Sequence, residues 1–175
     1  MALKIRKKFY DVEIPGLNSS ISVLASSPEE LNGRMIKYDL TRILRGKNLV
    51  ATLTIKNENG ALKSEFKSIK IMQPYIAKLM RTRISYIEDS FVCNTKDSKI
   101  RVKPFLLTRK KVHRKVRTAL RNKCRETISE LANGKTKDEF CSDVISSKIQ
   151  RNIIPKLKKI YPLSLCEIRI VEVEK

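Results

Sequence analysis

The chain has 175 residues, of which 41% are hydrophobic and 32% are charged, so it is long and apolar enough for one folded domain. Its 38 Lys and Arg outnumber its 18 Asp and Glu, and the net charge of +20 is most simply neutralised by a polyanionic partner. The longest uncharged run, residues 14–28, is rich in Ser and contains Gly and Pro, which excludes a membrane span or an apolar signal segment there. We therefore expect a soluble intracellular protein without a membrane partner.

The N-terminal part of the chain is predicted to be mainly β-structure. Residues 1–8 form a basic arm, expected to be disordered in the free protein and to lie on phosphates when bound. The segments "KFYDVEIPG" and "ISVLA" follow as two strands, the first ending in a turn at Pro15-Gly16. "SSPEELNG" is expected to form one helical turn, and "RMIKYDLTRIL" to begin as a strand.

Residues 49–71 carry the clearest hairpin pattern. Apolar residues alternate with polar ones, and Asn59-Gly60 provides the two positive φ angles of a type I′ turn. Phe66 falls on the opposite parity from Ile69 and Ile71, so that these residues cannot all face one side of a regular strand. The return strand is therefore predicted to contain a β-bulge or to change its neighbour.

Residues 72–87 have helical spacing, and Pro74 suits the first turn of a helix. The apolar positions of this predicted helix are Met72, Ile76, Leu79, Met80, Ile84 and Ile87. "SFVCNTKDSKIRVKPFLL" returns to a strand pattern on both sides of a polar turn.

A helix over residues 109–131 is predicted next, followed by a second helix or a pair of helices over residues 136–160. Thr136 and Glu139 match a capping box, and Pro155 is expected to kink or break the helix. The apolar stripe of this region consists of Phe140, Val144, Ile145, Ile149, Ile153, Leu157 and Ile160. "SLCEIRIVEVE" closes the chain as a strand.

This order of elements predicts an α+β fold, with a mostly antiparallel, barrel-like β-sheet and flanking helices. One domain spans residues 1–175. Its parts are the basic arm 1–8, a mainly β region with one helix over 9–105, a helical region over 106–160, and a final strand over 165–173. No homo-oligomer is expected.

The positive charge is concentrated in residues 99–125, which hold twelve Lys and Arg and no Asp or Glu. On a helix of about 100° per residue, one side is predicted to be apolar and the opposite side to carry a basic stripe. The apolar side consists of Val112, Val116, Ala119 and Leu120, and the stripe of Lys110, Arg114, Arg117, Arg121 and Arg125. Cys124 and Ile128 depart from this division, so the helix is expected to change neighbours there. Like charges at such spacing repel each other, and phosphates lying against the stripe would offset this repulsion.

The residue types in the patch favour phosphates of structured RNA or DNA as the polyanion. Arg recognises phosphate with paired N–H donors, and the predicted helix over residues 109–131 contains no Phe, Tyr or Trp, so stacking on single-stranded bases is not expected to be the main mode of the patch. Arg114, Arg117, Arg121 and Arg125 are expected to contact phosphates rather than base edges. The candidate RNA-binding residues are Lys4, Arg6, Lys7, Lys8, Arg34, Arg81, Arg83, Lys99, Arg101, Lys103, Arg109, Lys110, Lys111, Arg114, Lys115, Arg117, Arg121, Lys123 and Arg125.

Catalytic and metal-binding patterns are scarce. His113 is the single histidine and lies in the basic run, and no glycine loop resembles a nucleotide-binding motif. The cysteines, at positions 93, 124, 141 and 166, form no C-x-x-C pair, so they are expected to be buried thiols without zinc. Glu65-x-Lys67 with Asp39 is the one arrangement that resembles a metal-dependent nuclease, and this alternative stays open. A DNA-compaction protein, which should form a stable dimer, is a third possibility.

Five segments carry a resemblance when they are taken in order: "KKFYDVEIPG", "LNGRMIKYDLTRI", "MRTRISYIED", "KIRVKPFLLTRKK" and "KKIYPLSLCEIRIVEVEK". Together they resemble the archaeal and eukaryotic small-subunit ribosomal protein family called S-one-e or S-three-a-e. The second departs from the family pattern at Met35, Lys37 and Arg42, where two expected acids have become basic.

The resemblance implies a non-enzymatic structural constituent of the cytoplasmic ribosome without a cofactor. It implies binding to small-subunit rRNA on the platform, near the mRNA exit and the rRNA 3′ end, beside other small-subunit ribosomal proteins. It also implies a barrel-like β core with flanking helices.

Overall fold

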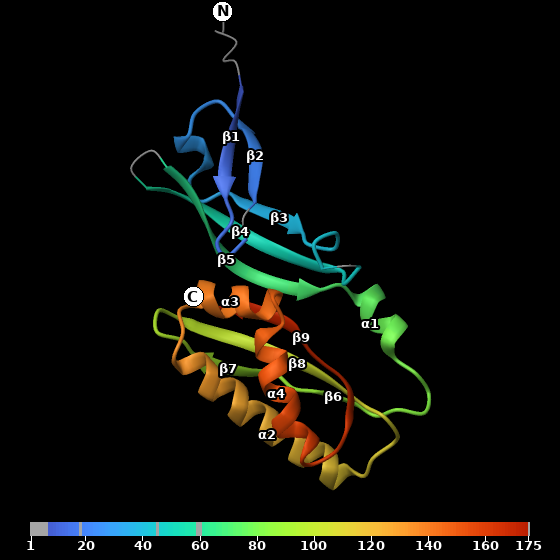
Figure 1. The fold of residues 1–175 in the computed structure, drawn as a ribbon. Helices are drawn as coiled ribbons and strands as arrows, with labels where there is room; N and C mark the ends of the chain where they lie inside the picture. The colour runs from blue at the N-terminus through green and yellow to red at the C-terminus, as the bar shows by residue number, and fades with distance from the viewer. Residues whose placement is uncertain (1–6, 18, 45, 59–60, 175) are drawn as a thin grey trace, which may run out of the picture.

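The computed structural model describes residues 7–17, 19–44, 46–58 and 61–174, and in them it places nine strands, four α-helices and one 3-10 helix (Figure 1). The strands are β1 (Lys8–Glu13), β2 (Ser20–Ala25), β3 (Met35–Asp39), β4 (Leu49–Glu58), β5 (Ala61–Ile71), β6 (Tyr86–Glu88), β7 (Phe91–Asn94), β8 (Lys99–Thr108) and β9 (Leu163–Val173). The helices are η1 (Glu29–Leu31), α1 (Gln73–Leu79), α2 (Arg114–Asn133), α3 (Lys137–Ile145) and α4 (Lys148–Lys158).

The nine strands form one mixed sheet, which confirms the α+β class. Its main path runs β2-β1-β5-β9-β8-β6, with β3 beside β4, β4 beside β5, and β7 beside β8. β1 and β5 pair in parallel, at Glu13 opposite Lys63, while the other pairings of the described strands are antiparallel. The path of described strands has two ends and does not close, so the barrel-like shape expected from the sequence does not form among them.

The sheet has two parts, which meet where β5 pairs with β9 (Figure 1). β1 to β5 make the upper part in this view, and β6 to β9 make the lower part together with α2, α3 and α4. Three residue pairs join the two long strands: Ser68 with Glu172, Ile69 with Val171, and Lys70 with Ile170. Nonlocal pairing between the middle and the end of the chain therefore holds the two parts together.

The long hairpin of β4 and β5 contains the predicted bulge. Thr52 pairs with Ser68 and Leu53 pairs with Phe66, which leaves Lys67 as the extra residue of β5. The shift allows Phe66, Ile69 and Ile71 to be buried together, as their parity in the sequence required. The Asn59-Gly60 turn lies outside the described residues.

Helix α3 is fixed to this hairpin and to the turn after β1. The Asp138 carboxylate accepts a hydrogen bond of 3.1 Å from the backbone N–H of Phe66, next to the bulge. Gly16, in the predicted turn, has a φ of +72°, and a Cβ at this position would lie 2.0 Å from the Ser142 hydroxyl oxygen. Glycine is therefore required there by both conformation and space.

The main core extends across both parts of the sheet, from the space between the helices and β8 and β9 to the buried residues of β4 and β5. A row of buried residues on α2 packs in the same cluster as a row on α4 and the apolar positions of the strands. These helical residues are Leu120, Cys124, Ile128 and Ala132 of α2, and Ile149, Ile153 and Leu157 of α4. A smaller core, formed by Val12, Ala25, Leu31 and Ile55, holds the upper part together.

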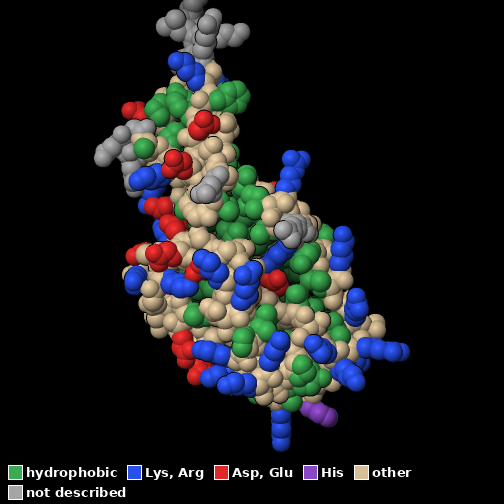
Figure 2. Space-filling view, viewed as in Figure 1, with side chains coloured by type: hydrophobic (Ala, Val, Ile, Leu, Met, Phe, Trp, Pro, Cys, Tyr) green, Lys and Arg blue, Asp and Glu red, His purple; other side chains and the backbone are tan. Residues whose placement is uncertain are grey.

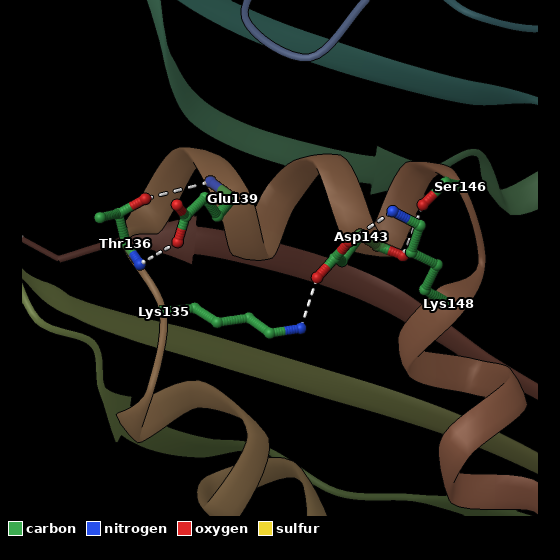
Figure 3. A network of polar contacts seen from close by, with 6 residues as sticks. All are labelled: Lys135, Thr136, Glu139, Asp143, Ser146 and Lys148. Atoms are coloured by element: carbon green, nitrogen blue, oxygen red, sulfur yellow. Dashed lines mark hydrogen bonds and ion pairs between the residues drawn. The ribbon is translucent and has the colours of Figure 1, made fainter.

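The capping box at the start of α3 is confirmed (Figure 3). The backbone N–H of Glu139 donates to the Thr136 hydroxyl at 3.3 Å, and that of Thr136 donates to the Glu139 carboxylate at 3.1 Å. The predicted stripe is buried from Phe140 through Leu157, whereas Ile160 is exposed. The two helices separate at Ser147, which has a φ of 59°. Of the kink or break expected at Pro155, the break does not occur, because α4 continues through this residue.

The predicted helix over residues 72–87 is too long. α1 ends at Leu79, and Ile87 is buried in β6, where it pairs with Leu106. The apolar residues after Leu79 have helical spacing only by coincidence. The conformation of β6 is determined by its pairing with a strand that is distant in sequence. β8 extends to Thr108 and α2 begins at Arg114, so residues 106–113 precede the helical region that was expected to start at 106.

Candidate nucleic-acid interface

Helix α2 begins with basic residues where a helix favours acidic ones. Its first turn holds no Asp or Glu, and Arg114, Lys115 and Arg117 are exposed there. His113, the N-cap residue, makes no side-chain capping hydrogen bond. The positive end of the helix dipole and the cationic side chains repel each other, typically by about 0.3–1 kcal/mol for each exposed charge. An anion bound at this end of α2 would remove that repulsion.

The buried row of α2 explains why the predicted stripe is only partly correct. Leu120, Cys124, Ile128 and Ala132 are spaced four residues apart, and such a row advances about 40° round the helix at each step. The row therefore crosses the basic line near Ile128, where the sequence indicated a change of neighbours. Ala119, expected on the apolar side, is exposed.

Residues 109–113, the first five of the predicted helix, lie before α2. Lys110, from the stripe, and Val112, from the apolar side, belong to the segment 109–113 between β8 and α2. Arg109, Lys110 and Lys111 are exposed in this segment. We use the name basic cluster for the Lys and Arg residues of segment 109–113 and of the first two turns of α2. None of these described residues makes an ion pair. They are Arg109, Lys110, Lys111, Arg114, Lys115, Arg117 and Arg121.

The segment 109–113 is held in place by hydrogen bonds with Thr108 and Ser85. The hydroxyl of the fully buried Thr108 donates to the Lys110 carbonyl at 2.6 Å and accepts from the Ser85 N–H at 3.0 Å. The Val112 N–H donates to the Ser85 hydroxyl at 3.1 Å. The basic cluster is therefore presented on a fixed backbone.

Tyr86 lies against the basic cluster, although the sequence places it 28 residues before Arg114. It is 54% exposed and lines the same cavity as Arg114, Arg117 and Arg121. The expectation that stacking on bases is not the main mode of the patch did not take this ring into account. It considered only neighbours along the chain, whereas β6 brings Tyr86 beside α2 through its pairing with β8.

Arg125 differs from the other predicted members of the stripe, because it is bound within the protein. Its guanidinium forms hydrogen bonds of 2.9–3.1 Å with the Asp89 carboxylate. It also lies over the ring of Phe91, with 5.4 Å between the guanidinium carbon and the ring centroid. This side chain joins α2 to the turn between β6 and β7.

Several other candidate residues are also paired with acids. On β8, Arg101 binds Glu174 at 2.7 Å, and Lys103 lies 3.9 Å from Glu172. On α2, Lys123 binds Glu126 at 2.7 Å. This part of the predicted patch is therefore largely neutralised, in contrast to the basic cluster.

The remaining candidates are spread over the molecule. Lys8 begins β1, Arg81 and Arg83 are exposed between α1 and β6, and Lys99 is exposed at the start of β8. Lys7 and Arg34 lie close enough to Glu30 to lower its pKa, after the larger effect of its hydrogen bond with the Ser26 N–H. Lys4 and Arg6 of the expected arm lie outside the described residues. Figure 2 shows Lys and Arg side chains projecting from the lower right of the molecule, while Asp and Glu are seen mainly along its left side.

The three residues of the nuclease interpretation have separate partners. Glu65 is bound by Lys56, at 2.5 Å, and by Lys137. The Lys67 ammonium lies 2.9 Å from the Met35 sulfur, and Asp39 accepts a hydrogen bond of 2.8 Å from the Thr41 N–H. Burial opposes ionisation of Glu65, but the hydrogen bonds from Lys137 and Lys56 outweigh it and lower its pKa. These contacts hold the three side chains in separate interactions rather than around a common site.

Two further searches cover only the parts of the chain that the structure describes. No group of three or more His, Cys, Asp and Glu side chains there is arranged to hold a metal ion. No helix there is long and apolar enough to cross a membrane.

Comparison with known proteins decides the family. The model of the Ribosomal S3Ae family matches residues 4–175. The chain belongs to this family. The resemblance found in the sequence is thereby confirmed, and with it the assignment to a family of ribosomal proteins rather than of enzymes.

Three archaeal proteins are among the curated relatives of this member of the S3Ae family. It is 30% identical over 187 residues to the small ribosomal subunit protein eS1 of Saccharolobus islandicus (strain L.S.2.15 / Lassen #1), covering 97% of this chain and 85% of that protein. The eS1 protein of Nanoarchaeum equitans is 28% identical over 173 residues, covering 94% and 87%. That of Saccharolobus solfataricus is 30% identical over 187 residues, covering 97% and 85%.

Proposed function

We propose that this S3Ae family member is a structural constituent of the small ribosomal subunit in the cytoplasm, where it binds rRNA. The observation that carries the proposal is the basic cluster, whose exposed cations lie at the positive end of α2 without acidic partners among the described residues. Folding alone gives no reason to gather these charges, because they repel one another and the helix dipole. Phosphates of a folded rRNA would neutralise them.

The names of the relatives support the same role, because each is a small ribosomal subunit protein. The finer placement follows from the family resemblance. We propose that the protein lies on the platform of the subunit, near the mRNA exit and the rRNA 3′ end, beside other small-subunit ribosomal proteins. Arg81, Arg83 and Lys99 are proposed as additional phosphate contacts, and Lys4, Arg6, Lys7 and Lys8 as contacts of the N-terminal arm.

The contacts of the cluster are proposed to be with phosphates rather than base edges. Arg114, Arg117 and Arg121 take the main role. Arg125 is a weaker candidate than the sequence indicated, because contact with RNA would compete with Asp89 for its guanidinium. Arg34, Arg101, Lys103 and Lys123 already have protein partners and are proposed to lie at the margin of the interface. An rRNA role also accounts for the basic composition better than a metal-dependent nuclease, whose proposed residues are engaged elsewhere.

The salt dependence of RNA binding tests this proposal. Each duplex phosphate contact contributes a slope of about −0.9 to log affinity against log salt concentration. Replacing Arg114, Arg117 and Arg121 by Gln should flatten the slope by up to about 2.7 units. A matched control replaces three cations that already have acidic partners, Arg101, Lys103 and Lys123, and should flatten it much less. Equal slopes for the wild type and the first variant would refute the proposed interface.

A separate measurement tests the assignment to the ribosome. In cell extract the protein should sediment with small subunits, and high salt should release it. A free DNA-compaction protein would instead sediment with DNA or as a dimer. Sedimentation away from small subunits at low salt would contradict the proposed function.

A further inference from the structure

The surface between β6 and the start of α2 is hollowed. Two cavities of about 560 and 280 Å³ share Tyr86, Arg117 and Arg121 as lining residues. Arg114 completes the smaller cavity, and the larger one extends to Val112. Pockets that hold small ligands are typically about 300–1,000 Å³ in volume, so one nucleotide is of suitable size for this hollow.

The hollow combines an aromatic surface with a concentration of positive charge. Tyr86 is 54% exposed although it belongs to a strand, so part of its ring faces solvent. Three guanidinium groups from two successive turns of α2 stand beside it. An exposed aromatic ring accepts a stacked base of any sequence, and guanidinium groups bind phosphate oxygens with paired N–H donors. This is the chemistry required by an unstacked nucleotide and not by a regular duplex, whose bases are covered.

Arg121 provides a second, independent observation. Its Nε atom is buried and has no hydrogen-bond partner among the described residues. The guanidinium therefore extends along the wall of the cavity without a protein acceptor to neutralise it. A phosphate in the cavity would bind to the Nη groups of this half-buried guanidinium, for which no hydrogen bond or ion pair is found among the described residues.

The acidic residue of the hollow does not cancel this charge. Glu88 lines the larger cavity, but its carboxylate is bound by Arg169, with 3.0 Å between Nη1 and Oε1. Gln73 accepts a further hydrogen bond of 2.9 Å from the same guanidinium. Lys111, also at the larger cavity, adds a fourth cation to the three arginines.

We infer that this hollow binds a single unstacked nucleotide of the RNA, with the base on the Tyr86 ring and the adjoining phosphates on Arg114, Arg117 and Arg121. The inference deepens the proposed function and rests on it. The Thr108 and Ser85 hydrogen bonds prepare the site, because they fix segment 109–113 before RNA arrives. A bulge or a single-stranded junction supplies such a nucleotide.

The test compares two RNAs, one a continuous duplex and the other the same duplex with one bulged 2-aminopurine nucleotide. Wild-type protein should bind the bulged RNA more tightly by about 5- to 150-fold, the equivalent of one stacked base. Binding should also change the fluorescence of the bulged base. Tyr86→Leu should abolish both the preference and the fluorescence change while leaving duplex affinity unaltered. Phe9→Leu is the matched control, since Phe9 is 74% exposed on β1 and should show no effect.

The outcomes separate this inference from the proposed function. Equal affinity for the two RNAs, with a salt slope that still depends on the arginines, would overturn the nucleotide site and leave rRNA binding intact. A preference that survives in Tyr86→Leu would also overturn it, because the base would then stack elsewhere. Failure to bind either RNA would overturn both proposals. Near-ultraviolet circular dichroism of Tyr86→Leu checks that its fold is retained.

Discussion

The Arg125 guanidinium and the Asp89 carboxylate form three hydrogen bonds of 2.9, 3.0 and 3.1 Å across the junction of α2 with the β6–β7 turn. The Asp89 side chain is only 13% exposed, whereas that of Arg125 is 51% exposed. The arginines that the sequence assigned to one stripe of the helix thus have different roles. Arg114 and Arg117 extend into solvent, while Arg125 stabilises the fold.

Replacing Arg125 by Gln is therefore expected to act on stability more than on RNA binding. The change leaves Asp89 mostly buried without its charged partner and should lower the free energy of unfolding by about 1–3 kcal/mol. Urea denaturation measures this. The salt slope of RNA binding should remain near that of the wild type. Arg117→Gln is the reciprocal control, and it should flatten the salt slope while leaving stability nearly unchanged. A flatter slope for Arg125→Gln and a loss of stability for Arg117→Gln would contradict this division of roles.

Glu65 makes stability depend on acidic pH. Burial acts to raise its pKa, but the hydrogen bonds from Lys137 and Lys56 outweigh burial, so the folded-state pKa lies below the ordinary value of 4.5. A carboxyl group with a depressed folded-state pKa contributes stability that is fully present above its unfolded-state pKa. That contribution is lost as pH falls below 4.5 and through the lower folded-state value. Glu65→Gln should therefore lose less stability than the wild type over this acidic range.

Thermal unfolding at a series of pH values measures the difference. Lys137→Met is the matched variant, because it removes one of the two cationic partners while keeping Glu65. It should weaken the pH dependence less than Glu65→Gln does, since Lys56 still binds the carboxylate. Parallel stability curves for Glu65→Gln and the wild type across the acidic range would show that Glu65 has no such role.

Local patterns identified much of the fold. The parity change between Phe66 and Ile69 predicted a bulge or a change of neighbour, and a bulge is found at Lys67; the pair Thr136 and Glu139 placed the start of α3. Each of these signals acts between residues close in sequence. The extent of the sheet could not be obtained in this way, because the pairing of residues 68–70 with residues 170–172 joins strands about a hundred positions apart.

The candidate site shows the same limit. The charge of segment 99–125 was visible in the sequence, but its division into paired and unpaired cations was not. Arg101 is neutralised by Glu174 and Arg125 by Asp89, and both acids come from other parts of the chain. Tyr86 was missed for the same reason. The available signal was the apolar parity of β6, with Ile87 turned into the core and Tyr86 therefore turned outward.

The four cysteines are expected to be unreactive in the folded protein, in agreement with the prediction of buried thiols. All four are buried. Burial raises the pKa of Cys124 and of Cys141 to about 12, and it raises that of Cys166 well above its ordinary value. Because the thiolate is the reactive form, an aromatic disulfide reagent near neutral pH should label none of them rapidly. All four should react in denaturant, and rapid labelling of one thiol in the native protein would contradict the packing.

The Thr108 hydroxyl is expected to influence RNA binding without touching RNA. It is fully buried and joins the Ser85 N–H to the Lys110 carbonyl, so it fixes the backbone that presents the basic cluster. Thr108→Val keeps the shape of the side chain but leaves two backbone groups without this partner, which should cost about 1–3 kcal/mol of stability. The affinity for RNA should fall as well, although no charge is removed.

The salt slope distinguishes this positioning effect from loss of a phosphate contact. With all cations retained, Thr108→Val should lower the affinity at every salt concentration and leave the slope near the wild-type value. Thr127→Val is the control, because the buried Thr127 hydroxyl bonds only within α2, to the Lys123 carbonyl at 2.8 Å. Stability by urea denaturation and affinity by titration across a salt series are measured for both variants. Wild-type affinity in a destabilised Thr108→Val protein would show that RNA does not require segment 109–113 to be fixed in advance.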